Sequence, residues 1–204
     1  MNRQETFWHG KGGNEYHLRN DEVSRVKQWQ KIIKEGDLYI KSAIEFGCGK
    51  GDNLHALRTI GVNRLTGIEV NTTAAAIAKA RTSSLIINES VESAVSQRGA
   101  GFIHEHDLVI SRGFLIHVPE CQLESTLLLL GCAKKYVVMI EYNDFKRREV
   151  KYHDEEEMLW ADAFAGKFLT LQADDGNTWS VKRLPLDLID GTTTHIFTRE
   201  GVTA

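Results

Sequence analysis

The sequence predicts an α/β fold with a mostly parallel central sheet, helices on both faces and a C-terminal antiparallel hairpin. Between residues 20 and 140, short apolar runs alternate with segments of helical periodicity, which is typical of β-α-β crossovers. The last two apolar runs, 179–184 and 194–198, have no helical segment between them. The dipeptide Asp190-Gly191 separates them and is a turn signal, so these runs predict the hairpin.

The first predicted helix spans residues 20–35 and comes before any strand. Its apolar side chains recur at spacings of three and four, and Gly36 is expected to end it. The residues that give this periodicity are Val23, Val26, Trp29 and Ile33.

The next hundred or so residues predict strands and helices in alternation. A buried strand over 43–46 runs into three glycines, and Asp52 or Asn53 is expected to cap the helix behind them. The elements that follow are a strand over 64–69, an alanine-rich helix over 73–81 capped by Asn71 or Thr72, strands over 85–87 and 107–110, a helix over 120–130 and a strand over 136–140.

Composition argues against several classes of protein. With 26% charged and 42% hydrophobic residues, the 204-residue chain fits one globular domain without long disorder. A net charge of −3 argues against nucleic acid as the main partner. Three widely spaced cysteines predict neither a disulfide framework nor a metal site, and they fit a reducing, cytoplasmic compartment. No apolar run is long enough for a membrane span, and no secretory signal is visible in residues 1–13.

A glycine turn follows the first predicted strand. Gly47, Gly49 and Gly51 form a G-x-G-x-G pattern, and glycines allow tight turning and close approach of the backbone to a ligand. Glu69 ends the second strand, where a carboxylate can accept hydrogen bonds from both hydroxyls of a ribose. Together the turn and the acid predict a nucleoside-containing ligand at the carboxyl ends of the strands.

The acidic residue before the turn separates two kinds of cofactor. The dinucleotide fingerprint is G-x-G-x-x-G, whereas this chain reads E-x-G-x-G-x-G from Glu45. That form resembles the first motif of class I methyltransferases, which implies a Rossmann-like fold and S-adenosylmethionine as the cofactor. In that family the acid lies near the methionine amine, the glycines lie beside the methionine and ribose, and a second acid binds the ribose. These roles fall on Glu45, Gly47, Gly49, Gly51 and Glu69.

The same resemblance implies further cofactor contacts. The segment after the third strand reads the adenine edge, which points to Ser90, Val91 and Glu92. Residues at the end of the fourth strand would lie beneath the sulfonium. The candidate cofactor set is completed by Tyr16, Arg19, Asn53, Val70, Ser111, Arg112 and Gly113.

Several segments together resemble a narrower family, the methylases associated with pseudaminic acid biosynthesis. They run in order over residues 7–166, and the N-E-Y-x-x-R-N and G-x-L-I-H pieces are the most specific of them. The resemblance implies a sugar or nucleotide-sugar acceptor. Residues 143–155 lack the prolines of the family's corresponding stretch, which leaves the acceptor open. The segments begin at Phe7, Gly13, Glu45, Gly67, Asp107, Glu141 and Leu159.

Three residues are candidates for the chemistry itself. His117 follows the fourth strand and could take a proton from an acceptor hydroxyl or amine; the alternative is a histidine that caps the loop before Pro119. Glu141 and Tyr142 end the fifth strand and could position an acceptor; the alternative is ordinary packing at a strand end.

The resulting hypothesis is methyl transfer from S-adenosylmethionine to an oxygen or nitrogen of a small molecule. Residues 1–36 would supply a lid segment and helix, with Arg19 on the cofactor carboxylate; the alternative is a frayed terminus. Residues 42–142 would form the cofactor-binding core and 143–204 the acceptor side and terminal strands. We expect no metal, nucleic acid or membrane partner. Two other functions remain open: a nicotinamide-dependent oxidoreductase, and a cofactor-binding regulatory protein without turnover.

Overall fold

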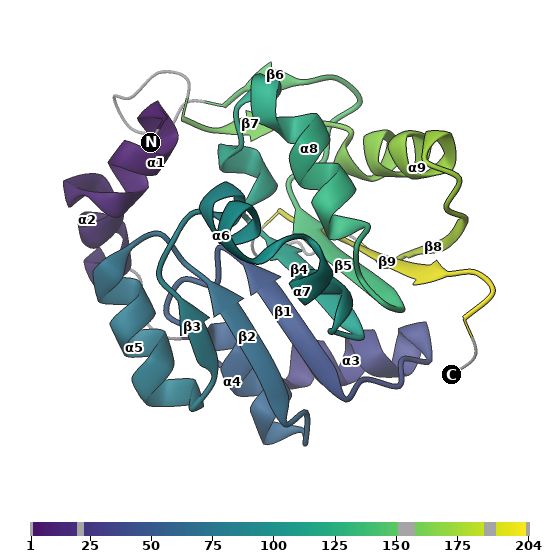
Figure 1. Ribbon diagram of the computed structural model, residues 1–204, viewed down its shortest axis with the longest axis horizontal. Coiled ribbons are helices and arrows are strands. Elements are labelled where there is room, and N and C mark those ends of the chain that lie inside the picture. Colours follow the sequence, from purple (N-terminus) through teal and green to yellow (C-terminus); the bar gives the residue numbers. More distant parts are fainter. Residues whose placement is uncertain (1, 20–22, 151–157, 186–190, 203–204) are drawn as a thin grey trace.

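A seven-stranded sheet forms the centre of the protein, whose computed structural model describes residues 2–19, 23–150, 158–185 and 191–202 (Figure 1). The strand order is β3-β2-β1-β4-β5-β9-β8. The strands are β1 (Ser42–Phe46), β2 (Arg64–Ile68), β3 (Leu85–Ile87), β4 (Leu108–Arg112), β5 (Tyr136–Glu141), β8 (Trp179–Arg183) and β9 (Thr193–Arg199).

The pairing within this sheet confirms the predicted class. Strands β1 to β5 pair in parallel, with β1 between β2 and β4. Strand β9 then pairs antiparallel with both β5 and β8, so the C-terminal hairpin enters the sheet through its second strand. Of the predicted Asp190-Gly191 turn, Asp190 lies outside the described residues. Because the five parallel strands share one direction, their carboxyl ends form a single edge on which a ligand site can assemble.

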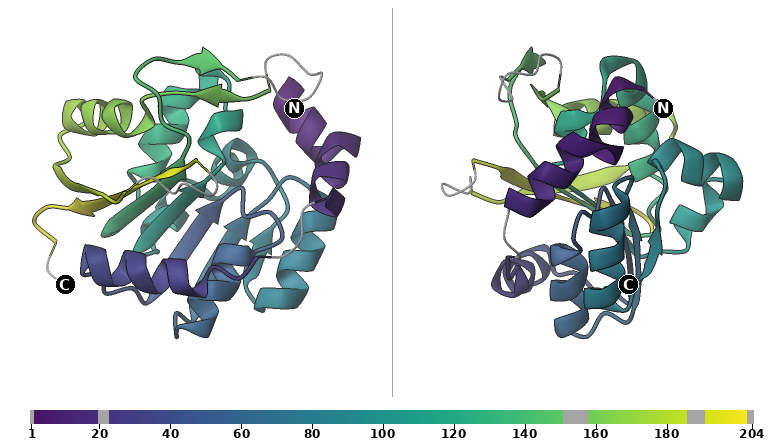
Figure 2. Two further views of the ribbon diagram at one scale, coloured as in Figure 1. Left: turned by 180° about the vertical axis from the view of Figure 1, so that it is seen from behind. Right: turned by 90° about the vertical axis from the view of Figure 1, so that its left-hand side faces the viewer.

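Helices cover both faces of the sheet, and each face has its own apolar core (Figure 2). The side chains of β1 alternate between the two cores, with Ile44 and Phe46 in one and Ala43 in the other. The first core is closed by α6 (Val91–Arg98), α7 (Gly101–His104), α8 (Glu120–Leu130) and α9 (Phe164–Asp174). The second is closed by α3 (Val26–Gly36), α4 (Asp52–Thr59) and α5 (Thr72–Thr82).

The N-terminal segment folds into two short helices, α1 (Arg3–His9) and α2 (Lys11–Arg19). They lie beyond the carboxyl ends of the central strands (Figure 1). No helix was expected here from the sequence. The helix predicted over 20–35 begins only at Val26, and Val23, which is 42% exposed, does not belong to its buried face. Residues 20–22 lie outside the described part of the chain.

The segment after β5 contains elements that were not predicted. A two-stranded antiparallel sheet pairs β6 (Arg148–Glu149) with β7 (Trp160–Ala161), and α9 follows it. A short 3-10 helix, η1 (Leu115–His117), lies between β4 and α8. Strand β7 contacts η1, which follows the carboxyl end of β4, and α9 packs against α8.

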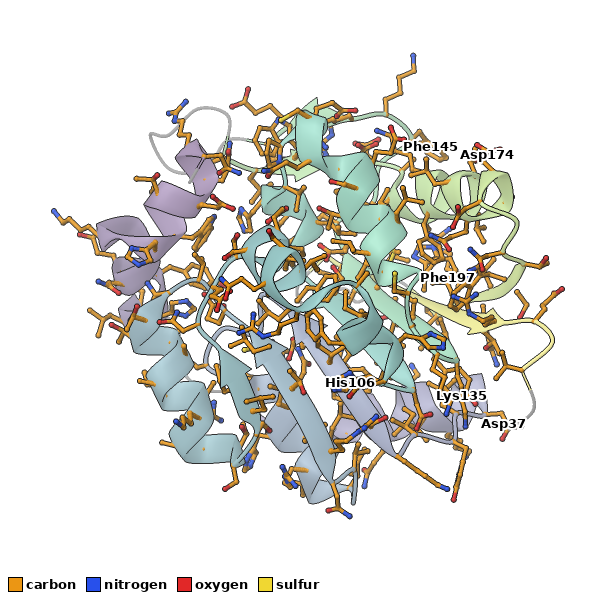
Figure 3. The ribbon with its side chains drawn as sticks, in the orientation of Figure 1. Asp37, His106, Lys135, Phe145, Asp174 and Phe197 are labelled. Atoms are coloured by element: carbon orange, nitrogen blue, oxygen red, sulfur yellow. The ribbon has the colours of Figure 1, made fainter. Side chains whose placement is uncertain are left out.

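Polar side chains at the amino ends of the parallel strands have structural partners. His106, marked in Figure 3, makes hydrogen-bond contacts through its Nε2 with Thr66 Oγ1 at 2.9 Å and through its Nδ1 with the Phe102 carbonyl. Asp107 accepts a hydrogen bond from the Lys41 amide and pairs with Lys135. No group of three or more potential metal ligands gathers among the described residues. None of the helices described is long and apolar enough to cross a membrane.

Candidate active site at the carboxyl edge of the sheet

A cavity of about 450 Å³ opens at the carboxyl ends of β1, β2 and β4. The glycine turn and the end of β2 form its floor, and α1 and α2 contribute Trp8, Tyr16 and His17 to its wall. This volume lies within the range of small-molecule sites in proteins.

The glycine turn has the conformation that its sequence predicted. Gly47, Gly49 and Gly51 all have positive φ, at 65°, 54° and 80°, where other L-residues are strained. A side chain at Gly47 would also collide with the Phe114 ring, since its Cβ would lie 2.6 Å from the ring's Cδ2. Gly47 and Gly49 line the cavity, whereas Gly51 is the N-cap of α4 and packs against α5.

Glu69 joins the turn to the end of β2. Its Oε2 accepts a hydrogen bond from the Gly49 amide at 2.7 Å, and its Oε1 accepts one from the Asn71 amide at 2.8 Å. Burial raises the pKa of this carboxyl, and the hydrogen bonds from Asn71 and Gly49 oppose that rise. The Val70 backbone is a third donor to this carboxyl. A carboxylate has about four lone-pair sites, so Glu69 can still accept from a ligand in the cavity.

Asn71 connects Glu69 to the N-terminal helices. Its side-chain oxygen caps α5 by accepting from the Ala74 amide, as the sequence predicted, in place of Thr72. Its side-chain amide donates to the Trp8 carbonyl and to Asn14 Oδ1, both at 2.9 Å. One fully buried residue therefore holds α1 and α2 against the end of β2.

Glu45 is the next-to-last residue of β1 and is 2% exposed at the cavity wall. Its Oε1 accepts a hydrogen bond from Asn53 Nδ2 at 2.6 Å, and its buried Oε2 has no hydrogen-bond partner among the described residues. Desolvation raises the pKa of Glu45 to about 8, although the Asn53 hydrogen bond acts in the opposite direction. The prediction that Asp52 or Asn53 caps α4 was wrong, because Gly51 is the N-cap and Asn53 binds Glu45 instead.

Glu141 ends β5 but does not line the cavity. Its Oε1 accepts hydrogen bonds from Ser111 Oγ at 2.5 Å and from the amides of Phe114 and Leu115 at 3.1 and 3.2 Å. Burial raises its pKa to about 7. Glu141 therefore holds the turn that follows β4.

His117 is the last residue of η1 and lines the cavity. Its Nδ1 lies 2.8 Å from the Met158 carbonyl, which can only accept, so Nδ1 carries a proton. Desolvation lowers the pKa of His117 to about 4, so the ring is neutral and Nε2 is unprotonated. The Trp8 ring packs edge-on against it, with ring centroids 4.4 Å apart.

Most of the predicted site residues lie around this one cavity. Arg19 does not, since it is exposed at the end of α2. Gly51, Ser111 and Glu141 are also outside the lining. Arg25 and His17 line the cavity but were not predicted, because an isolated basic residue gives no periodic or motif signal. The predicted residues in the lining are Tyr16, Glu45, Gly47, Gly49, Asn53, Glu69, Val70, Ser90, Val91, Glu92, Arg112, Gly113, His117 and Tyr142.

Comparison with known proteins agrees with the fold. Residues 44–126, which include the glycine turn and Glu69, match a family described as a methyltransferase domain. No curated protein matches the chain.

Solved structures of methyltransferases have a similar fold over most of this chain. The methyltransferase domain of bacterial CtHen1 is 18% identical, with a TM-score of 0.62 over 86% of this chain and 96% of that one. Magnesium protoporphyrin IX methyltransferase from Synechocystis PCC 6803, crystallised with S-adenosylmethionine, is 13% identical, with a TM-score of 0.60 over 98% and 99%. The plantazolicin methyltransferase BpumL, in complex with a substrate analogue and S-adenosylhomocysteine, is 14% identical, with a TM-score of 0.62 over 92% and 88%.

Proposed function

Since the chain carries a methyltransferase domain of the class I fold, whose cofactor is S-adenosylmethionine, we propose that it methylates an oxygen or nitrogen of a small molecule. The observation that carries this proposal is the convergence of Glu45, the glycine turn and Glu69 on one cavity. A nicotinamide-dependent oxidoreductase has no comparable support, because the turn lacks the dinucleotide spacing and the matching domain is a methyltransferase.

The residues present fit the cofactor. Glu45 offers a buried oxygen without a hydrogen-bond partner among the described residues, which suits the methionine ammonium group. Gly47 and Gly49 line the cavity and have no side chains, so the backbone of the turn can lie close to a ligand. Glu69 has lone pairs for the ribose hydroxyls, and Ser90, Val91 and Glu92 line the cavity where the adenine would lie. When bound, the cofactor supplies an electrophilic methyl group on a sulfonium.

A different arginine takes the role first given to Arg19. Arg25 lines the cavity just before α3, and Arg112 lines it at the end of β4. A guanidinium can bind a carboxylate through two parallel hydrogen bonds. We assign the methionine carboxylate to Arg25, with α1 and α2 covering the cofactor.

The protein's contribution to methyl transfer is orientation of the acceptor and exclusion of water. His117 is neutral with Nε2 unprotonated, so it can accept a hydrogen bond from an acceptor hydroxyl or N–H and receive its proton. A pKa near 4 makes this imidazole a weak base, so its orienting role outweighs its basicity. Tyr142 lines the same wall, whereas Glu141 acts through the turn that carries His117.

A sugar or nucleotide-sugar is the acceptor that we propose. The support for it is the sequence resemblance over residues 7–166, together with aromatic and amide side chains such as Trp8 and Gln4 in the wall. Such pockets combine apolar faces with a few polar groups that fix orientation. Two of the structural neighbours are named for small-molecule substrates, magnesium protoporphyrin IX and a plantazolicin analogue.

A ligand screen tests the cofactor first. S-adenosylmethionine and S-adenosylhomocysteine are expected to raise the melting temperature, whereas NAD and NADP are not. Stabilisation by a nicotinamide cofactor alone would overturn the assignment. Incubation with S-adenosylmethionine and a panel of sugars and nucleotide-sugars, followed by mass spectrometry, then identifies methylated products. Binding without any product would favour the regulatory alternative.

The role of His117 is tested once an acceptor is known. His117→Ala should lower kcat about tenfold or more while leaving the affinity for S-adenosylhomocysteine within about twofold. His117→Gln keeps a hydrogen-bond acceptor and should recover part of kcat. Full activity in His117→Ala would remove this residue from the chemistry.

A further inference from the structure

The indole of Trp29, which lies behind the cavity, is linked by two hydrogen bonds through Asn53 to the buried acid Glu45. Trp29, on α3, is fully buried and does not line the cavity. Its Nε1 donates a hydrogen bond to Asn53 Oδ1 at 3.0 Å, and Asn53 Nδ2 donates to Glu45 Oε1 at 2.6 Å. The chain of contacts runs from an outer helix, through α4, to the end of β1.

The chemistry of this chain leaves only one orientation for each group. An indole nitrogen can only donate, so the carboxamide of Asn53 must present its oxygen to Trp29. Its NH₂ group must then face Glu45 and donate to Oε1. When Glu45 is protonated, its proton must therefore reside on Oε2, the buried oxygen without a hydrogen-bond partner among the described residues.

We infer that Trp29 is a positioning residue for ligand binding: through Asn53, its indole N–H reserves Glu45 Oε2 for a cationic amine in the cavity. This inference rests on the proposed function, because the amine is that of the cofactor's methionine portion. When the ligand binds, Glu45 Oε2 loses its own proton to solvent. The resulting carboxylate oxygen accepts a hydrogen bond from an N–H of the ammonium group, which keeps its proton.

Without the indole N–H, the Asn53 side-chain amide can flip, so that its oxygen and its NH₂ group exchange places. Its oxygen could then accept a hydrogen bond from protonated Glu45, which stabilises the neutral acid and disfavours the carboxylate. The other charged groups around Glu45 are Arg112 at the end of β4, Asp52 on α4 and Glu69 at the end of β2, and Trp29→Phe leaves all three in place.

Trp29→Phe tests the inference because it removes the N–H and keeps most of the buried ring. Calorimetry should compare S-adenosylhomocysteine, which carries the amine, with 5′-methylthioadenosine, which lacks the amino-acid portion. We expect the variant to bind S-adenosylhomocysteine about two- to tenfold more weakly at pH 7 and 5′-methylthioadenosine unchanged. The loss should shrink as the pH rises from 7 towards 9, because a growing fraction of Glu45 is then ionised in both proteins.

A matched control is Trp179→Phe, since Trp179 lies on β8, away from the cavity, and its Nε1 has no hydrogen-bond partner among the described residues. It should bind both ligands as the wild type does. Equal weakening of both ligands by Trp29→Phe, or no weakening of either, would overturn the inference. If Trp29→Phe fails to fold, Asn53→Ala removes the bridging amide and should show the same ligand selectivity. Failure of the wild-type protein to bind S-adenosylhomocysteine would instead count against the proposed function.

Discussion

Glu45 and Glu141 are buried acids near the carboxyl ends of β1 and β5, yet the structure uses them differently. Each is buried, each accepts hydrogen bonds through Oε1, and the Oε2 of each has no partner among the described residues. The donor to Glu45 is a side chain on α4, and Glu45 lines the cavity. The donors to Glu141 include two amides of the turn after β4, and Glu141 lies behind that turn. A buried acid near a strand end is therefore a ligand candidate only if its side chain lines the cavity.

The largest expected difference between the two acids is in stability. Glu141→Ala leaves the Ser111 hydroxyl and two backbone amides without their acceptor, which should lower the free energy of unfolding by roughly 2–4 kcal/mol. Glu45→Ala removes a desolvated carboxyl that has one donor, so its cost should be about 1 kcal/mol or less. Denaturant unfolding measures both. Equal destabilisation would contradict this distinction between the two acids.

Ligand affinity should depend more on Glu45 than on Glu141, which is the reverse of the order expected for stability. Glu45→Gln removes the negative charge that faces a bound amine and should weaken S-adenosylhomocysteine about tenfold. Glu141→Gln keeps an oxygen for the amides of the turn and should change the affinity by about twofold at most. Calorimetry at pH 8 provides the comparison. Unchanged affinity in Glu45→Gln would remove Glu45 from the cofactor site.

The pH dependence of stability should be a smaller effect that still separates the two acids. Burial raises the pKa of Glu45 to about 8 and of Glu141 to about 7, so the folded protein holds these protons at pH values where the unfolded chain has lost them. The contribution of these two acids to the free energy of unfolding without ligand should therefore fall as the pH rises from about 4.5 towards 8.

The buried histidines act in the opposite direction at lower pH. Their pKa values are lowered to about 4, so they add stability as the pH rises from about 4 to 6.5 and contribute little change above that. Between pH 6.5 and 8 the fall should thus come from the two acids and amount to about 1 kcal/mol or more. Glu45→Gln should flatten the curve up to pH 8, whereas Glu141→Gln should flatten it mainly below pH 7. A curve that rises over this interval in the wild type would contradict both raised pKa values. The histidines in question are His17, His117 and His195.

Local sequence signals predicted the core of the fold. Apolar runs, helical periodicity and the Asn71 cap involve residues close together in the chain, and these elements form as expected. Helix α9 had a signal that was overlooked, since Phe164, Phe168 and Gln172 recur at a spacing of four and are all buried. In contrast, α2 contains two adjacent glycines that disfavour a helix. It forms against Trp8 and Asn71, since a Cβ on Gly13 would lie 1.9 Å from the Trp8 carbonyl oxygen.

Sequence patterns alone were enough to predict the parallel sheet, the glycine turn and the acids at the ends of β1 and β2, because hydrophobic periodicity and glycine conformation act over a few residues. They could not predict which of the buried acids would line the cavity. That depends on contacts between distant segments: Trp29 and Asn53 orient Glu45, while the turn after β4 supplies the donors to Glu141. Hydrogen bonds of this kind require donors and acceptors to align within a few tenths of an ångström, and that alignment exists only once the distant segments have packed together.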